Sequence, residues 1–186
     1  MPLPELETLL RPAGYYRQKA RSLKTFVEFV DNSYGGSLSR MFAEPTVKLR
    51  HELLALKGVG PETADAILLY AGQHEVFVVD AYARRILQRH GIAPEDSDYE
   101  SVRALFERSF SARGSSDRSA WEGGNQDRAG AFVSSPHRPT PMSVMPRSAV
   151  AQRYGEMHGL VVSVGKHYCL KSKPKCEACP LRGFLP

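Results

Sequence analysis

Three cysteines lie near the C-terminus, and the chain has no others. They stand in the pattern Cys169-x6-Cys176-x2-Cys179. An odd and tightly clustered set of cysteines favours metal ligands over a disulfide framework. Thiolates suit both zinc and iron–sulfur clusters. We therefore predict a metal-binding loop at the end of the chain. Three free thiols left from a decayed site are the alternative.

A glycine-rich break interrupts the middle of the chain at Lys57-Gly58-Val59-Gly60-Pro61. Two glycines within three residues allow backbone angles closed to other residues, and proline suits the first turn of a new helix. Such a hairpin brings backbone N–H groups and a helix start against a phosphate, with no side chains to obstruct them. An ordinary tight turn has the same glycines. The candidate contact residues are Lys57, Gly58, Val59, Gly60 and Thr63.

The elements that must position these residues are helices. Apolar residues recur at helical spacing on both sides of the glycine break, and Asp80 directly precedes one such stretch, where aspartate is a good N-cap. The chain has no internal repeat, and we predict an all-α fold. The expected helices cover residues 3–10, 16–30, 47–56, 62–70, 81–90, 99–110 and 149–168.

The predicted domain organisation has three parts. A helical domain covers residues 1–110 and contains the hairpin at 56–61. Residues 111–148 are rich in Gly, Ser, Pro and Arg, have no apolar period and are expected to form a flexible insertion. The C-terminal helix and the cysteine loop occupy residues 149–186.

The composition is that of a globular protein, because 42% of the 186 residues are hydrophobic and 24% are charged. A net charge of +5 favours a polyanionic partner, although many basic proteins bind no nucleic acid. No apolar run approaches the ~20 residues of a membrane span, and the N-terminus lacks the pattern of a secretory signal. We therefore expect a cytoplasmic protein with no membrane partner.

Residues 56–85 closely resemble the endonuclease III, or helix-hairpin-helix (HhH-GPD), superfamily of DNA glycosylases. The block 154–169 matches a later helix of that family, and the nearest branch is that of endonuclease III-related proteins near 3-methyladenine glycosylase III. The resemblance implies a helix-hairpin-helix glycosylase fold, a nucleoid-associated monomer, and double-stranded DNA with a damaged base as the partner. Five residues of the hairpin region fall in register with the family pattern: Gly58, Val59, Gly60, Ala64 and Asp80.

In that family the aspartate of the Val-Asp pair is catalytic, which implies this role for Asp80. The N-glycosidic bond breaks through a cationic sugar, and a nearby carboxylate can stabilise that charge or activate water. Asp80 can also be only the N-cap of helix 81–90, or do both. Bifunctional members carry a lysine where this chain has Glu62, and a carboxylate cannot form a Schiff base. The resemblance therefore implies base release without AP-lyase strand scission.

The cysteine spacing matches the first three ligands of the family's four-iron (4Fe-4S) cluster. The fourth cysteine of the pattern would stand at Leu185. Zinc is the alternative metal, with His167 as a candidate fourth ligand. Lys166, Lys171, Lys173 and Lys175 surround the loop and suit phosphate contacts even without a metal.

The chain departs from the family in its late start, its insertion and its missing fourth cysteine. These departures suggest an N-terminally truncated or degenerate member of marginal stability. Three hypotheses follow: a monofunctional DNA glycosylase, a DNA-binding remnant without catalysis, and a metal-loop protein with secondary DNA contact. The damaged base is not identified.

Overall fold

The computed structural model describes residues 1–113 and 147–186. The described residues form helices and no β-strand, which confirms the all-α prediction. They fall into two compact units, Met1–Val78 and Val79–Pro186. Most of the insertion expected over 111–148 lies outside the described residues, but its first three residues continue a helix.

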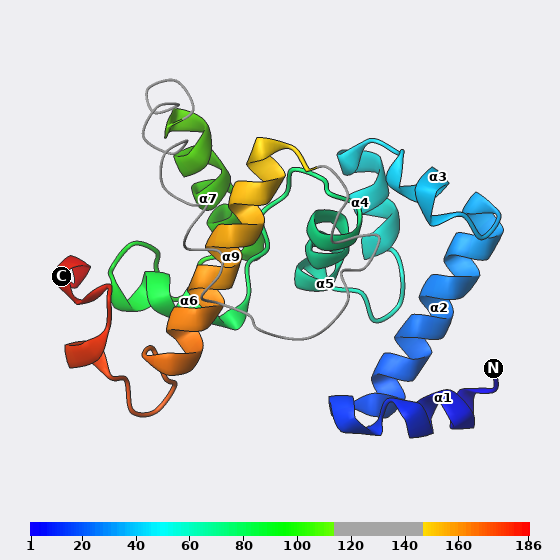
Figure 1. The fold of residues 1–186 in the computed structure, drawn as a ribbon, viewed down its shortest axis with the longest axis horizontal. Helices are drawn as coiled ribbons and strands as arrows, with labels where there is room; N and C mark the ends of the chain where they lie inside the picture. Colours follow the sequence, from blue (N-terminus) through cyan, green and yellow to red (C-terminus); the bar gives the residue numbers. More distant parts are fainter. Residues whose placement is uncertain (114–146) are drawn as a thin grey trace, which may run out of the picture. The chain divides into compact units, whose positions relative to one another are not determined.

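The first unit begins with helices α1 and α2, which pack on each other, and contains the glycine hairpin between α4 and α5 (Figure 1). The hydroxyl of Tyr34 at the end of α2 donates a hydrogen bond to Glu52 of α4, and burial of Tyr34, with Glu52 beside it, raises its pKa to about 12. The helices of this unit are α1 (Leu3–Leu9), α2 (Tyr16–Tyr34), α3 (Leu38–Phe42), α4 (Thr46–Leu54) and α5 (Pro61–Ala66).

The core of the first unit lies between α4 and α5. Leu49 and Leu53 of α4 and Ala64 of α5 are fully buried. Helix α5 continues into a π-helical turn, Ile67–Ala71, which keeps Leu68 buried as well. Because α4 and α5 pack on each other, burial of these apolar side chains holds the two arms of the hairpin together.

Among its described residues, the second unit contains helices on either side of residues 114–146, followed by the cysteine loop. Its helices are α6 (Ala81–Arg89), α7 (Tyr99–Arg113) and α9 (Ala149–His167). Helices α6 and α9 pack side by side (Figure 1). Gly165 allows this approach, because a Cβ atom there would lie 2.3 Å from the ring of Tyr82. Two 3-10 turns, Cys176–Ala178 and Arg182–Phe184, shape the loop that follows α9.

The helix bounds agree with the sequence prediction to within about four residues, with two differences. Helix α3 was not predicted, and α2, whose end was expected at residue 30, continues to Tyr34 and ends at Gly35, whose φ is +60°. Residues before Gly35 stay helical because Tyr34 is buried, with its ring 5.5 Å from that of Phe29. Within the described residues, no helix combines the length and the apolar character that a membrane span requires.

Candidate functional site

The hairpin between α4 and α5 has the tight glycine geometry that its sequence predicts. Gly58 has a φ of +88°, which an L side chain rarely adopts, and the amide of Val59 donates to the carbonyl of Leu56 at 3.1 Å. Val59 is buried and anchors the turn, whereas Gly58 and Gly60 are exposed. Ser22 of α2 lies against Gly58 and donates a hydrogen bond of 3.5 Å to its carbonyl, whereas a Cβ at Gly60 would meet no atom within 4 Å. The backbone at Gly60 is therefore open to a partner.

An ion pair fixes the two helices that flank the hairpin. Arg50 of α4 meets the fully buried carboxylate of Asp65 of α5 through two hydrogen bonds, of 2.6 and 3.1 Å. This bidentate geometry is the strong form of a charged hydrogen bond. Lys57 and Thr63, the two further candidate contacts, are exposed on either side of the glycines.

Asp80 lies at the start of α6 and is 8% exposed. Its Oδ1 accepts a hydrogen bond of 2.7 Å from the amide of Ala83, so the predicted N-cap role is present. That bond uses one carboxylate oxygen, and Oδ2 faces helix α9. The structural role therefore leaves one oxygen of Asp80 for chemistry.

His158 of α9 stands beside this second oxygen, with its Nε2 3.6 Å from Oδ2 of Asp80. Burial of the carboxyl acts most strongly and works to raise the pKa of Asp80, but His158 and the amides of Ala83 and Tyr82 together outweigh it. The pKa of Asp80 is thus held below its usual value, and the carboxylate is ionised at neutral pH. His158 was not predicted as a site residue, and its only signal in the sequence was its place in the block 154–169.

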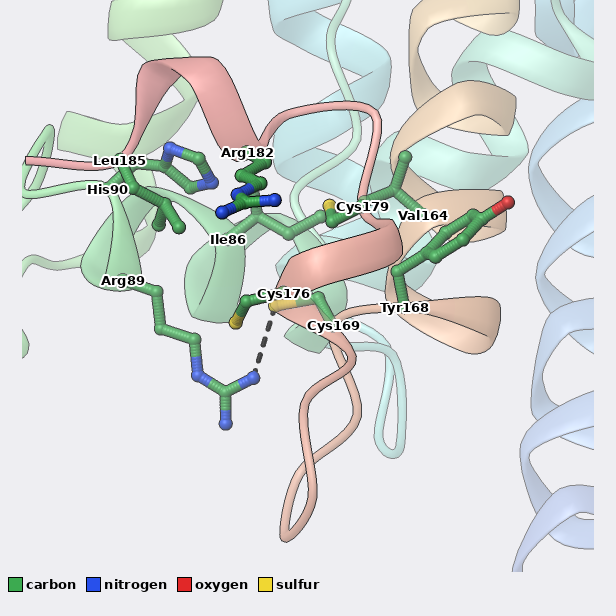
Figure 2. Close-up of a pocket in the computed structure, with 10 residues that line it drawn as sticks. All are labelled: Ile86, Arg89, His90, Val164, Tyr168, Cys169, Cys176, Cys179, Arg182 and Leu185. Atoms are coloured by element: carbon green, nitrogen blue, oxygen red, sulfur yellow. Dashed lines mark hydrogen bonds between the residues drawn. The ribbon is translucent and has the colours of Figure 1, made fainter.

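The three cysteines line one pocket of the second unit (Figure 2). Leu185 lines the same pocket, as expected of the residue at the position of the fourth cysteine. His167, the candidate zinc ligand, is exposed and does not line it; its Nδ1 lies 2.9 Å from the carbonyl of Ser163. A different histidine, His90, does line the pocket.

Two arginines of α6 attach the cysteine loop to the helix. Arg89 donates to Sγ of Cys169 at 3.2 Å and to the carbonyls of Leu170 and Lys171 at 2.8 and 3.0 Å. Arg85 donates to the carbonyl of Cys169 at 2.7 Å. Because these bonds come from the protein alone, the loop is held against α6 whether or not a metal is bound.

The cysteine side chains line a common space without converging on one point. Among residues 1–113 and 147–186, no group of three or more cysteine, histidine or acidic side chains is placed to hold a metal ion. A single tetrahedral ion such as zinc needs all its ligands within about 2.3 Å of one centre. In a cluster each thiolate binds a different iron, so the thiolates stand farther apart. The three thiols and the imidazole of His90 that line the pocket are ligand types that iron–sulfur clusters accept.

Comparison with known proteins decides the family. The model of the HhH-GPD superfamily of base excision DNA repair proteins matches residues 1–112, which include the hairpin and Asp80. The chain belongs to this superfamily. This HhH-GPD chain is also 33% identical over 97% of its length to a protein of Methanocaldococcus jannaschii named as a DNA repair glycosylase, and 23% identical over 97% to endonuclease III of Bacillus subtilis.

Solved structures of HhH-GPD relatives share the fold. A 3-methyladenine DNA glycosylase of H. pylori, bound to 1,N6-ethenoadenine, aligns with a TM-score of 0.69 and 30% identity over 89% of this chain and 64% of its own. An endonuclease III trapped in a covalent intermediate with DNA aligns with a TM-score of 0.63 and 23% identity, over 100% of this chain and 65% of its own. The present chain spans 65% of the Methanocaldococcus protein and 61% of the Bacillus one.

Proposed function

We propose that this HhH-GPD protein is a DNA N-glycosylase that releases a damaged base from double-stranded DNA. The observation that carries the proposal is Asp80, a largely buried carboxylate that the fold keeps ionised next to His158. Perturbed ionisable groups of this kind cluster at functional sites. Asp80 also lies within residues 1–112, which the model of base excision DNA repair proteins matches, and this supports the proposal.

Asp80 would act on the sugar. When the N-glycosidic bond breaks, the electron pair leaves with the base and the sugar gains positive charge. The ionised carboxylate stabilises that charge, and it can also take the proton of the water whose oxygen bonds to the sugar. The amide of Ala83 bonds Oδ1, and the imidazole of His158 stands 3.6 Å from Oδ2, so a different group positions each oxygen of the carboxylate.

The hairpin would hold the DNA backbone. Gly58 and Gly60 are exposed, and no side chain caps the start of α5 at Gly60, so the turn presents backbone to a phosphate. Lys57 and Thr63 lie next to it and supply a positive charge and a hydroxyl. These contacts would place the DNA without selecting its sequence.

Release of the base would leave the DNA strand intact. Glu62 is exposed at the start of α5, where bifunctional relatives have lysine, and its carboxylate cannot attack the sugar to form a Schiff base. We therefore propose a glycosylase without AP-lyase activity. Borohydride trapping of a covalent DNA adduct would contradict this part of the proposal.

The cysteine loop would hold an iron–sulfur cluster. Three thiols that line one pocket without converging on a point fit a cluster, which supplies local structure to the loop when bound. The basic residues Lys171, Lys173 and Lys175 are exposed on this loop and would add phosphate contacts.

Alkylated purines are the first substrates to test, because the H. pylori relative is a 3-methyladenine glycosylase bound to 1,N6-ethenoadenine. Duplexes that each carry one lesion, with oxidised pyrimidines included, are incubated with the protein, and free base and strand breaks are measured separately. We expect free base from at least one lesion, with breaks only after alkaline treatment. DNA binding without base release from any lesion would instead identify a DNA-binding module that lacks catalysis.

A further inference from the structure

A histidine of the second unit lies where the family's fourth thiolate is missing. His90 directly follows α6, and its Nδ1 is 2.8 Å from the carbonyl oxygen of Phe184. Phe184 precedes Leu185, so this bond places the imidazole next to the position of the absent cysteine. Figure 2 shows His90 and Leu185 together at one side of the pocket that the cysteines line.

We propose that His90 is the fourth protein ligand of an iron–sulfur cluster whose other ligands are Cys169, Cys176 and Cys179. The inference rests on the cluster proposed above and is independent of base release. On binding, the three thiols lose their protons to solvent, and the neutral imidazole binds iron through the lone pair of Nε2. No redox change is required of the protein.

The hydrogen bond to Phe184 gives His90 the arrangement of a metal ligand. A ligating histidine almost always donates its other ring N–H to a carbonyl or carboxylate, which fixes the tautomer and the ring orientation. Because the carbonyl of Phe184 can only accept, Nδ1–H donates to it, and in the neutral imidazole Nε2 then carries the lone pair. Imidazole is an accepted ligand of iron–sulfur clusters, in which it replaces cysteine at one iron of the Rieske type and raises the reduction potential.

The charges around the pocket suit a thiolate-bound cluster. Arg89 donates a hydrogen bond to Sγ of Cys169, and Arg182, which forms an ion pair of 2.7 Å with Glu177, also lines the pocket. Hydrogen bonds to cluster sulfurs and nearby positive charge stabilise the thiolate form and tune the potential. Replacement of His90 is expected to leave the unit folded, because Arg85 and Arg89 still hold the loop to α6.

His167 provides a matched control for His90. Each of these histidines has Nδ1 within 2.9 Å of a backbone carbonyl near the cysteine loop, but only His90 lines the pocket. The test compares the wild type, His90→Gln and His167→Gln after anaerobic reconstitution with iron and sulfide. Iron and sulfide content, electron paramagnetic resonance, and nitrogen hyperfine coupling to the cluster are measured.

We expect about four irons per chain and a nitrogen coupling in the wild type and in His167→Gln. His90→Gln should lose the coupling and about one iron, with the spectrum of a three-iron cluster. Leu185→Cys added to His90→Gln should restore the lost iron without restoring the coupling, because it returns a thiolate to the family position.

Several results would overturn the assignment of His90. These are a wild-type cluster without nitrogen coupling, full iron and coupling in His90→Gln, or a wild type that takes up zinc and no iron. A wild type that holds the histidine-ligated cluster but releases no base would leave this inference standing and defeat the proposed function alone.

Discussion

At the residue scale, Asp80 combines an N-cap hydrogen bond with a proposed catalytic role. Its N-cap bond to Ala83 is retained by asparagine, which is an equally good N-cap, so Asp80→Asn removes the charge without removing the cap. This makes the variant a clean probe of what the charge contributes to stability and to chemistry. His158, 3.6 Å away, is the neighbour most affected by the change.

The depressed pKa of Asp80 predicts how stability depends on pH. Because the folded carboxyl has a lower pKa than the unfolded one, its contribution is present above the usual value of 3.8 and is lost as pH falls through the folded pKa. At neutral pH we expect the free energy of unfolding of the wild type to be higher than that of Asp80→Asn. Denaturant titrations from pH 7 down to about pH 3 should show this difference shrink. A difference that stays constant would contradict the pKa shift.

At the element scale, the local patterns were predictable and the distant partners were not. The hairpin and the N-cap of α6 depend on neighbouring residues, so glycine spacing and an aspartate before a helix were sufficient to find them. His158 and His90 have their proposed roles through contacts with residues far along the chain, Asp80 and Phe184 respectively. A single sequence does not show which residues meet across packed helices. For this reason His167 was chosen as the candidate fourth ligand, although His90 is the histidine that lines the pocket.

The packing of α9 on α6 predicts opposite effects for two glycines of α9. In Gly165→Ala the new Cβ would lie 2.3 Å from the ring of Tyr82, so the helices must separate, at a cost of about 1–3 kcal/mol. In Gly159→Ala the exposed Cβ meets nothing within 4 Å, and the change should stabilise by about 0.5–1 kcal/mol through helix propensity. Thermal melts of both variants check this, and equal effects would contradict the packing.

The hairpin glycines predict a separation of stability from DNA binding. Gly58→Ala should destabilise by about 1–2 kcal/mol, because φ is +88° there and Ser22 lies in the path of the Cβ. Gly60→Ala has ordinary φ and open space, so its stability should change by less than about 0.5 kcal/mol. If the turn approaches a phosphate, Gly60→Ala should still weaken DNA binding several-fold. Unchanged affinity in a folded Gly60→Ala would argue against a hairpin contact.

At the scale of the whole molecule, the net charge of +5 and the exposed lysines predict salt-dependent DNA binding. Binding that neutralises phosphates releases counterions, so affinity should fall by about tenfold or more between about 50 and 200 mM salt. Lys57→Ala should reduce the slope of log affinity against log salt by about one. Fluorescence anisotropy with an undamaged duplex measures both, and binding that does not respond to salt would exclude phosphate contacts as its source.

The central claim concerns what Asp80 does to the glycosidic bond. The most direct measurement is the single-turnover rate of base release from a lesion duplex, at saturating protein, for the wild type and Asp80→Asn. We expect the variant to bind the duplex with an affinity within a few-fold of that of the wild type. Its rate of base release should be lower than the wild-type rate by about 100-fold or more. An Asp80→Asn protein that releases the base as fast as the wild type would contradict the account.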